Sequence, residues 1–260
     1  MTGPGELVVD PDGEILRLWL SNPGRRNAIT WPMYDELERI RERVDSDSGI
    51  RVVVLRGAGG DAFAAGTDIR QFTEFTTAEQ GVEYEQRVGR VLDSLLAIRV
   101  PVVAVVEGPA VGAGLALAAC CDLIVATPDA VFGAPVARTL GNCLPPAVVA
   151  RLNQRLGAGR TMAMLLTSRL LPATEAATAG LVHEVLDRES LDEKVEQLLT
   201  TIRRNAPLTL AAFKEIDRRI QRDGPGVDAD DVLASCYGSA DFQEGVAAFL
   251  DHRTPHWQGR

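Results

Sequence analysis

The order of apolar and polar residues in the first half of the chain alternates between two kinds of pattern. Alternation with a period of two, or a short unbroken apolar run, predicts strands at residues 6–9, 14–20, 51–55, 102–106, 122–126 and 131–132. Apolar residues at helical spacing predict helices at residues 31–44, 78–98 and 113–120. Strand, small-residue turn and helix recur at intervals of roughly 50 residues. This recurrence predicts an α/β fold in which helical crossovers join parallel strands.

The strand pattern fades after residue 185. Residues 190–220 and 226–252 keep helical spacing with little strand signal, so we expect two helical segments there. We therefore interpret residues 1–195 as the core and residues 196–260 as a C-terminal helical region. This region carries more apolar side chains than a peripheral appendage can bury alone, which predicts an interface. They are Phe213, Ile216, Ile220, Val232, Leu233, Phe242, Val246, Phe249 and Leu250.

Composition narrows the range of partners. The 260 residues include 27 basic and 36 acidic side chains, and the resulting formal charge of −9 disfavours a general nucleic-acid or anionic-membrane surface. The most apolar stretch, residues 100–119, contains Pro101, Glu107 and Pro109, so we do not expect it to span a membrane. No cluster of histidines and acidic residues has metal-ligand spacing, which predicts no metal site. The four cysteines suit reduced thiols and predict a cytoplasmic location.

Two runs of small residues are the strongest chemical signal, AFAAGTDI at residues 62–69 and GPAVGAGLALA at residues 108–118. Each joins an apolar strand to a helix, so each can present bare backbone N–H groups at a helix start. Two such loops facing one pocket would direct a pair of donors at a single oxygen atom, as in an oxyanion hole. Either run alone could equally serve tight packing of a helix on a strand. Neither has the spacing of a nucleotide-binding or phosphate-binding loop.

Together the two runs resemble the oxyanion loops of the crotonase (enoyl-CoA hydratase/isomerase) superfamily, A-F-x-A-G-x-D and G-x-A-x-G-G-G. The resemblance extends over nearly the whole chain and includes the run DFQEGV at residues 241–246. It implies a spiral of ββα repeats and a C-terminal helical region that assembles a homotrimer or a dimer of trimers. It also implies an acyl-CoA thioester as substrate, with no cofactor other than the coenzyme A within that substrate.

The resemblance assigns roles to individual residues. The backbone N–H groups of Thr67 and Ala113 are expected to polarise the thioester carbonyl and stabilise the enolate. The basic residue that lies near the coenzyme A phosphates in the family corresponds to Arg25 or Arg26. The full set expected to bind the coenzyme A thioester is Arg25, Arg26, Ala28, Ala65, Gly66, Asp68 and Ile69.

The chain departs from the hydratases of this family at their two acid–base positions. Those enzymes carry a Glu two residues after the last Gly of the second loop and another after a Phe-Gly-x-Pro turn, where this chain has Ala116 and Val136. Neither side chain can activate water or deliver a proton. We expect Arg138 and Asn142, polar groups of the segment after Val136, to act in catalysis instead. Further polar candidates are Thr139 and Cys143 in that segment and Glu85, Gln86 and Asp93 on the predicted helix at residues 78–98.

The resemblance therefore implies an acyl-CoA-processing enzyme that stabilises a thioester enolate, by default an enoyl-CoA hydratase-like lyase. Isomerisation, decarboxylation, C–C bond cleavage and thioester hydrolysis stay open, because the two loops stabilise an enolate whichever step follows it. The alternative from another class is a non-catalytic acyl-CoA-binding subunit, although a pure binder has less need of two aimed donors.

Overall fold

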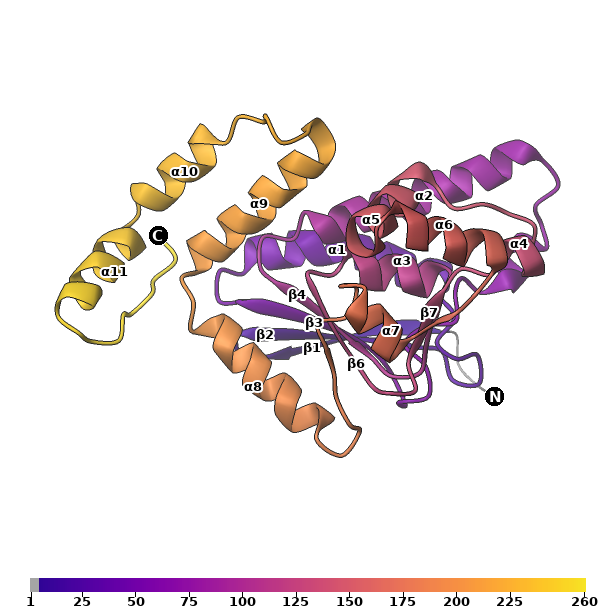
Figure 1. Cartoon of the computed structure of the whole chain (residues 1–260), viewed down its shortest axis with the longest axis horizontal. Helices are drawn as coiled ribbons and strands as arrows, with labels where there is room; N and C mark the ends of the chain where they lie inside the picture. The colour runs from indigo at the N-terminus through magenta and orange to yellow at the C-terminus, as the bar shows by residue number, and fades with distance from the viewer. Residues whose placement is uncertain (1–4) are drawn as a thin grey trace.

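The computed structural model describes residues 5–260, and its centre is a six-stranded sheet (Figure 1). The strands of this large sheet are, in spatial order, β1 (Glu6–Asp12), β2 (Ile15–Ser21), β3 (Val52–Gly57), β4 (Val102–Val106), β6 (Leu123–Ala126) and β9 (Glu184–Val185). The hairpin of β1 and β2 is antiparallel, and every later pairing in the large sheet is parallel. Parallel neighbours require crossovers, which the intervening helices supply.

A second, three-stranded sheet lies beside the first and consists of β5 (Pro109–Val111), β7 (Val131–Gly133) and β8 (Leu171–Pro172). The chain visits the two sheets in turn. It passes from β4 into β5 and then α3 (Ala113–Cys120), and from β6 into β7 and then α4 (Val136–Thr139). Each turn thus adds one strand to each sheet before a helix, which confirms the predicted α/β spiral of ββα repeats.

Both faces of the large sheet are buried. One face packs in a single core with the main crossover helices, α1 (Trp31–Ser46), α2 (Ala78–Leu96) and α3. The opposite face packs on α8 (Leu191–Arg203), where Val54 and Val105 of the sheet meet Leu199. Strands covered on both faces have no solvent side, which explains why residues 52–55 of β3 and all of β4 are apolar.

The helices between residues 140 and 180 are α5 (Pro146–Leu156), α6 (Ala158–Thr167) and α7 (Ala173–Thr178). Beyond α8 the chain forms α9 (Pro207–Asp223), α10 (Asp230–Tyr237) and α11 (Ala240–Leu250). The helical character predicted for residues 190–220 is confirmed, and it is divided between α8 and α9. Pro207 has no N–H to donate to an earlier turn, so it starts a new helix at its first position. The core boundary at residue 195 stays a prediction, and it falls within α8.

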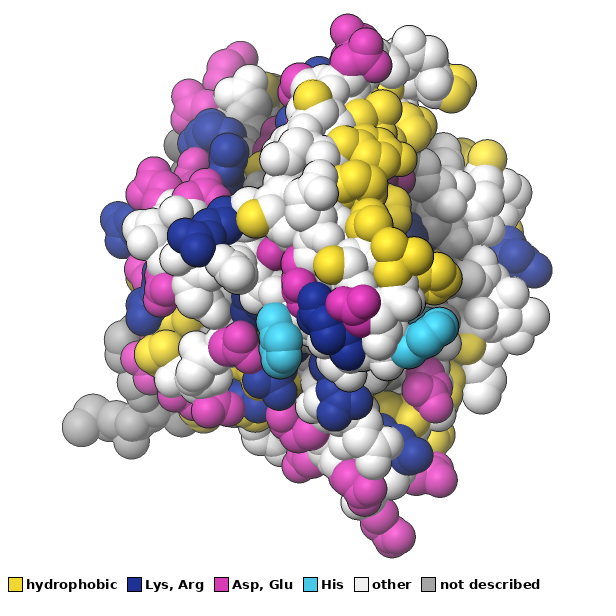
Figure 2. Space-filling model, turned by 90° about the vertical axis from the view of Figure 1, so that its left-hand side faces the viewer, with side chains coloured by type: hydrophobic (Ala, Val, Ile, Leu, Met, Phe, Trp, Pro, Cys, Tyr) yellow, Lys and Arg dark blue, Asp and Glu magenta, His cyan; other side chains and the backbone are white. Residues whose placement is uncertain are grey.

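The C-terminal helices extend away from the sheets, with α10 and α11 on the left-hand side of Figure 1. Hydrophobic side chains gather in a stripe on the face of the molecule seen from that side (Figure 2). The exposed large apolar residues of α9, α10 and α11 are Phe213, Ile220, Leu233, Tyr237, Phe242, Val246, Phe249 and Leu250. Phe249 is 81% exposed and Leu250 is 71% exposed, so the rest of the chain leaves uncovered side chains that normally lie in a core or an interface.

Within residues 5–260, no helix is both long enough and apolar enough to cross a bilayer.

Candidate active site

The first small-residue loop is held by a parallel bridge to the segment before α1. The Ile29 N–H donates to the carbonyl of Gly66 over 2.8 Å, and the Ile29 carbonyl accepts from the N–H of Asp68 over 2.9 Å. In a parallel pairing the residue between these two contacts directs its own N–H to the other side. The N–H of Thr67 therefore points away from Ile29, and it takes part in none of the hydrogen bonds that residues 5–260 form.

The second small-residue loop lies directly beside the first. The Val111 N–H donates to the carbonyl of Ala64 over 2.9 Å, which joins β5 to the first loop. Gly112 then turns the chain into α3 with φ 56° and ψ −117°, dihedrals that require glycine. The first hydrogen bond of α3 runs from the Ala116 N–H to the Gly112 carbonyl over 3.0 Å. The N–H of Ala113 precedes this bond and has no intrahelical partner.

Close packing explains why the second loop continues with small residues. A β-carbon added at Gly114 would lie 2.2 Å from the carbonyl oxygen of Ala64, well inside contact distance. The start of α3 therefore approaches the first loop as closely as backbone allows. A larger residue at position 114 would push the two loops, and with them the N–H groups of Thr67 and Ala113, apart.

A cavity of about 280 Å³ opens between the two loops and the helices α2, α4 and α5. Figure 1 shows α2, α3, α4 and α5 gathered on one side of the large sheet. The lining is mostly apolar and includes both Thr67 and Ala113. Its residues are Ala65, Gly66, Thr67, Ile69, Phe72, Tyr84, Glu85, Val88, Val111, Gly112, Ala113, Ala116, Pro135, Val136, Thr139, Leu140, Asn142, Leu144, Pro145 and Val148.

Glu85 is the one carboxyl group among the described residues that line this cavity. It lies on α2, half-buried, and it has no ion-pair or hydrogen-bond partner within residues 5–260. Burial penalises the charged form and raises the pKa of Glu85 to about 7. A carboxyl group with that pKa exchanges a proton readily near neutral pH.

Known proteins are similar to this chain in sequence and fold. The family model described as Enoyl-CoA hydratase/isomerase matches residues 11–260. The chain belongs to this family. It is 32% identical to the 2,3-dehydroadipyl-CoA hydratase of Escherichia coli, over 98% of this chain and 99% of that protein. It is 31% identical to the carnitinyl-CoA dehydratase of Proteus mirabilis, over 95% of this chain and 96% of that protein.

A solved structure agrees over the whole chain. The crystal structure of an enoyl-CoA hydratase/carnithine racemase from Magnetospirillum magneticum superposes with a TM-score of 0.91. That protein is 32% identical, and the match covers 100% of this chain and 97% of the other. The resemblance to the crotonase superfamily is thereby confirmed, and with it the fold and the assignment to a family of acyl-CoA-processing enzymes.

Several residues that the resemblance assigned to the site lie together in this member of the enoyl-CoA hydratase/isomerase family. The cavity is lined by Thr67, Ala113, Asn142, Ala65, Gly66 and Ile69. Ala116 and Val136 also line the cavity. The two positions at which hydratases of the family carry glutamate are therefore apolar here.

Arg138 is not among the residues that line the cavity, so its catalytic role stays a prediction without support from this lining. The single turn of α4 directs Val136, Thr139 and Leu140 toward the cavity. Residues three or four apart share one face of a helix, so the residues between them point elsewhere. Arg138 is accordingly exposed and is absent from the lining.

Asp68 supports the first loop from outside the cavity. Its carboxylate accepts from the Arg70 N–H over 3.1 Å, which caps the short 3₁₀ helix η1 (Ile69–Phe72). It also forms an ion pair with the Arg70 guanidinium. The hydrogen bonds from Arg70, with a smaller contribution from Arg25, lower the pKa of Asp68. Asp68 thus stays ionised and shapes the loop that carries Thr67.

The loop at residues 22–28 places Arg25 and Arg26 at the surface near the first small-residue loop. Asn27 is buried, and its amide donates to the carbonyls of Ala58 and Ala62 over 2.9 and 2.8 Å. The Ala65 N–H donates to the carbonyl of Arg26 over 3.0 Å. These bonds tie the basic turn, and Ala28 after it, to the segment that leads into the cavity, while both arginine side chains stay exposed.

A cluster of hydroxyls at this site could not be foreseen from the sequence. The hydroxyls of Tyr34 and Tyr84 lie 2.6 and 2.7 Å from the Oγ1 atom of Thr67. Burial raises the pKa of both tyrosines, so both stay protonated near neutral pH. The available signal was a tyrosine on the inner face of each of two neighbouring helices, which by itself is typical of a core.

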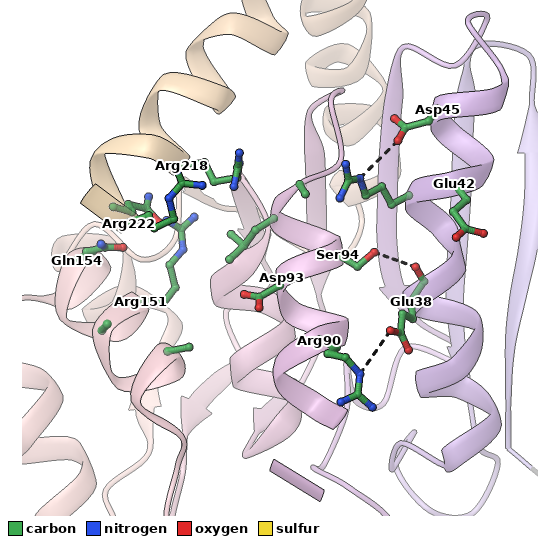
Figure 3. A pocket seen from close by; sticks show the side chains of 16 residues that line it. Glu38, Glu42, Asp45, Arg90, Asp93, Ser94, Arg151, Gln154, Arg218 and Arg222 are labelled. Carbon is green, nitrogen blue, oxygen red and sulfur yellow. Dashed lines mark hydrogen bonds and ion pairs between the residues drawn. The ribbon is translucent and has the colours of Figure 1, made fainter. Parts of the chain in front are cut away.

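A wider cavity of about 880 Å³ lies between α1, α2, α5 and α9 (Figure 3). Charged side chains dominate it, with Arg90 3.8 Å from Glu38 and Arg41 3.5 Å from Asp45. Asp93 lines this cavity instead of the smaller one. No residue of either small-residue loop reaches it, so we exclude it as the site of thioester chemistry.

Proposed function

We propose that the protein is an enzyme that binds an acyl-CoA thioester and stabilises its enolate, with the N–H groups of Thr67 and Ala113 as the oxyanion donors. One observation carries this proposal. Both residues line the same cavity, and neither N–H has a partner within residues 5–260. Donors held in place by the backbone need no reorganisation when negative charge develops on the thioester oxygen.

The second part of the proposal is that Glu85 is the catalytic base. Removal of the α-proton of a thioester requires a base near the carbonyl, and Glu85 is the carboxyl group that the described lining supplies. With a pKa of about 7, about half of the Glu85 carboxyl groups are ionised at neutral pH, and the carboxylate is a stronger base than an ordinary one. Ala116 and Val136 cannot take this role. We assign Asn142 a hydrogen bond to the acyl group, since this residue lines the same cavity.

Within the family, an enoyl-CoA hydratase-like lyase is the function that we propose first, in keeping with the hydratase and dehydratase among the relatives. A double-bond isomerase is the second candidate, because one carboxyl group lines the cavity. A single carboxylate can remove a proton from one carbon of an enoyl thioester and return it to another. Hydration is a different reaction, because one group must activate water for addition to the β-carbon and a proton must be delivered to the α-carbon.

We further propose that Arg25 and Arg26 bind the coenzyme A phosphates, because their turn is tied to the loop that carries Thr67. The thioester end of the same ligand would then contact Ala65, Gly66 and Ile69, which line the cavity. Ala28 and Asp68 would act indirectly, by holding the loop in place. Coenzyme A within the substrate is the only cofactor in this proposal. The cytoplasmic location stays a prediction. The four cysteines are free thiols within residues 5–260.

The decisive experiment is to titrate the protein with a cinnamoyl-CoA thioester and follow its ultraviolet absorption. Polarisation of the carbonyl moves the absorption of a conjugated thioester to longer wavelength, so we expect a red shift that saturates at one ligand per subunit. Free coenzyme A is the control, because it competes for the site but has no carbonyl to polarise. Binding without a red shift would contradict the oxyanion assignment. Turnover of crotonyl-CoA and of 3-hexenoyl-CoA then distinguishes hydration from isomerisation.

Assembly is a separate prediction. We propose a homotrimer or a dimer of trimers, because α9, α10 and α11 expose more apolar surface than a monomer normally leaves in water. Sedimentation velocity at micromolar concentration should show a species of three or six subunits. Phe249→Glu together with Leu250→Glu should shift it toward the monomer, whereas Glu83→Gln on the exposed side of α2 should not. A monomeric wild type would refute the prediction.

A further inference from the structure

Two tyrosine hydroxyls converge on the side chain of Thr67, directly behind the proposed oxyanion donor. Tyr34 reaches it from α1 over 2.6 Å, and Tyr84 reaches it from α2 over 2.7 Å. Tyr34 and Tyr84 lie 33 and 17 residues from Thr67 in the sequence, so the fold, and not a local motif, brings the three hydroxyls together. Within residues 5–260, Thr67 thus keeps its N–H free for a ligand, while its hydroxyl contacts two tyrosine hydroxyls.

The ring of Tyr84 is fixed by its neighbours. It meets Phe72 edge-on, with ring centroids 4.8 Å apart, and it meets Trp31 edge-on at 5.7 Å. Such contacts are favourable for aromatic rings and restrict their rotation. The hydroxyl at the end of this ring is therefore held at Thr67 while the residue lines the cavity.

Two directions are possible for these hydrogen bonds, because either hydroxyl of each pair could be the donor. Each of the three hydroxyls has one hydrogen to donate. If Tyr84 donated to Thr67 and Thr67 to Tyr34, the hydrogen of Tyr34, which is 1% exposed, would have the Tyr84 oxygen as its acceptor in the core. That closed ring would leave no hydrogen for a ligand. The opposite direction, from Tyr34 to Thr67 to Tyr84, leaves the spare hydrogen on the hydroxyl of the residue that lines the cavity.

We infer that Tyr84 donates this hydrogen to the thioester oxygen, as a third donor beside the N–H of Thr67, and that Tyr34 sets its direction through the Thr67 hydroxyl. The inference rests on the proposed acyl-CoA function. Tyr84 is then a catalytic residue, whereas Tyr34 and the side chain of Thr67 are positioning residues. Thr67 links the backbone donor to the tyrosine donor. Its N–H would bind the thioester oxygen, and its Oγ1 would hold the Tyr84 hydroxyl beside that oxygen.

The chemistry of the cluster supports donation and not proton loss. Burial raises the pKa of Tyr84, so the phenol stays neutral at the pH where Glu85 titrates. The proton of Tyr84 therefore stabilises charge on the thioester oxygen without leaving the phenol. Glu85 removes the α-proton, and the two neighbouring residues of α2 divide the work between base and hydrogen-bond donor.

The test is the absorption of bound cinnamoyl-CoA in five variants. Tyr84→Phe and Thr67→Val should each reduce the red shift of the bound ligand, and the double variant should reduce it no further, because both break one chain of donors. Thr67→Ser is the matched control for Thr67→Val, since it restores the hydroxyl and should recover most of the shift. Tyr34→Phe should reduce the shift by a smaller amount without changing the fraction of ligand bound.

Exchange of the α-proton of butyryl-CoA in deuterated water gives the second measurement. We expect Tyr84→Phe to lower the rate constant at saturation by about 10- to 100-fold, less than the roughly 10²–10³ for a backbone oxyanion donor, with little change in KM. Should Thr67→Val fail to fold, Tyr84→Phe decides the result alone, because its ring and packing are unchanged.

The outcomes separate this inference from the function on which it depends. A wild type that binds cinnamoyl-CoA without a red shift would contradict the proposed oxyanion site itself. A wild type with a red shift that Tyr84→Phe leaves unchanged would overturn only the role of Tyr84. Additive losses in Tyr84→Phe and Thr67→Val would show that the two side chains act independently, which contradicts the proposed chain of hydrogen bonds.

Discussion

Ala113→Pro is expected to lower the rate of α-proton exchange of butyryl-CoA about 10²- to 10³-fold, the usual effect of deleting one oxyanion donor. Ala113 is the first residue of α3, where its N–H has no partner in the helix. Proline is tolerated at that position because its fixed φ suits a helix start and its missing N–H breaks no helical bond. The substitution therefore removes the proposed donor while the helix remains.

The measurement is nuclear magnetic resonance of butyryl-CoA in deuterated water, together with the thermal midpoint of each variant. Ala113→Ser is the matched control, since it changes the side chain and keeps the N–H, and it should retain most of the activity. A proline variant that unfolds normally and still exchanges protons at the wild-type rate would exclude Ala113 as a donor.

Glu85→Gln is expected to slow the same exchange by about 10²–10⁴, the usual contribution of a general base. The carboxylate form is the base, and it forms as the pH rises through the pKa of about 7. The wild-type rate should therefore increase with pH up to and slightly beyond 7 and then become constant. Glutamine cannot titrate, so the variant should lose this dependence while binding butyryl-CoA normally.

Asp93→Asn is the matched control for Glu85→Gln. Asp93 lies on the same helix, and burial raises its pKa as well, although Arg218 partly opposes the increase. Because it lines the wider cavity, its substitution should leave both the exchange rate and the pH profile unchanged. A Glu85→Gln variant that keeps the wild-type pH profile would show that another group is the base.

The main strands and the two loops could be predicted because each depends on a local pattern. The buried runs of β3 and β4 are apolar whatever surrounds them, and small residues mark a close approach of backbones. The strand β5, in contrast, could not be predicted from Pro109–Val111 alone. Its three residues pair with β7 and bridge to Ala64, both distant along the chain, so tertiary pairing and not propensity creates it.

The side chains of the site could be proposed from sequence but not ranked. Glu85 and Arg138 were both polar residues near the expected pocket. The difference between them is the direction in which α2 and α4 present each side chain, which depends on how these helices pack. The cluster of Tyr34 and Tyr84 around Thr67 was missed for the same reason, since only the packed helices bring the hydroxyls together.

The bridges from Ile29 to the first loop and from Val111 to Ala64 have a consequence for how such an enzyme can evolve. They hold the two proposed N–H donors through main-chain atoms, so this part of carbonyl activation does not depend on the side chains at positions 85, 116 and 136. Mutations at positions such as 85, 116 or 136 can then exchange one proton chemistry for another while the enolate is stabilised throughout. New reactions become accessible by single substitutions, each from an ancestor that is already active.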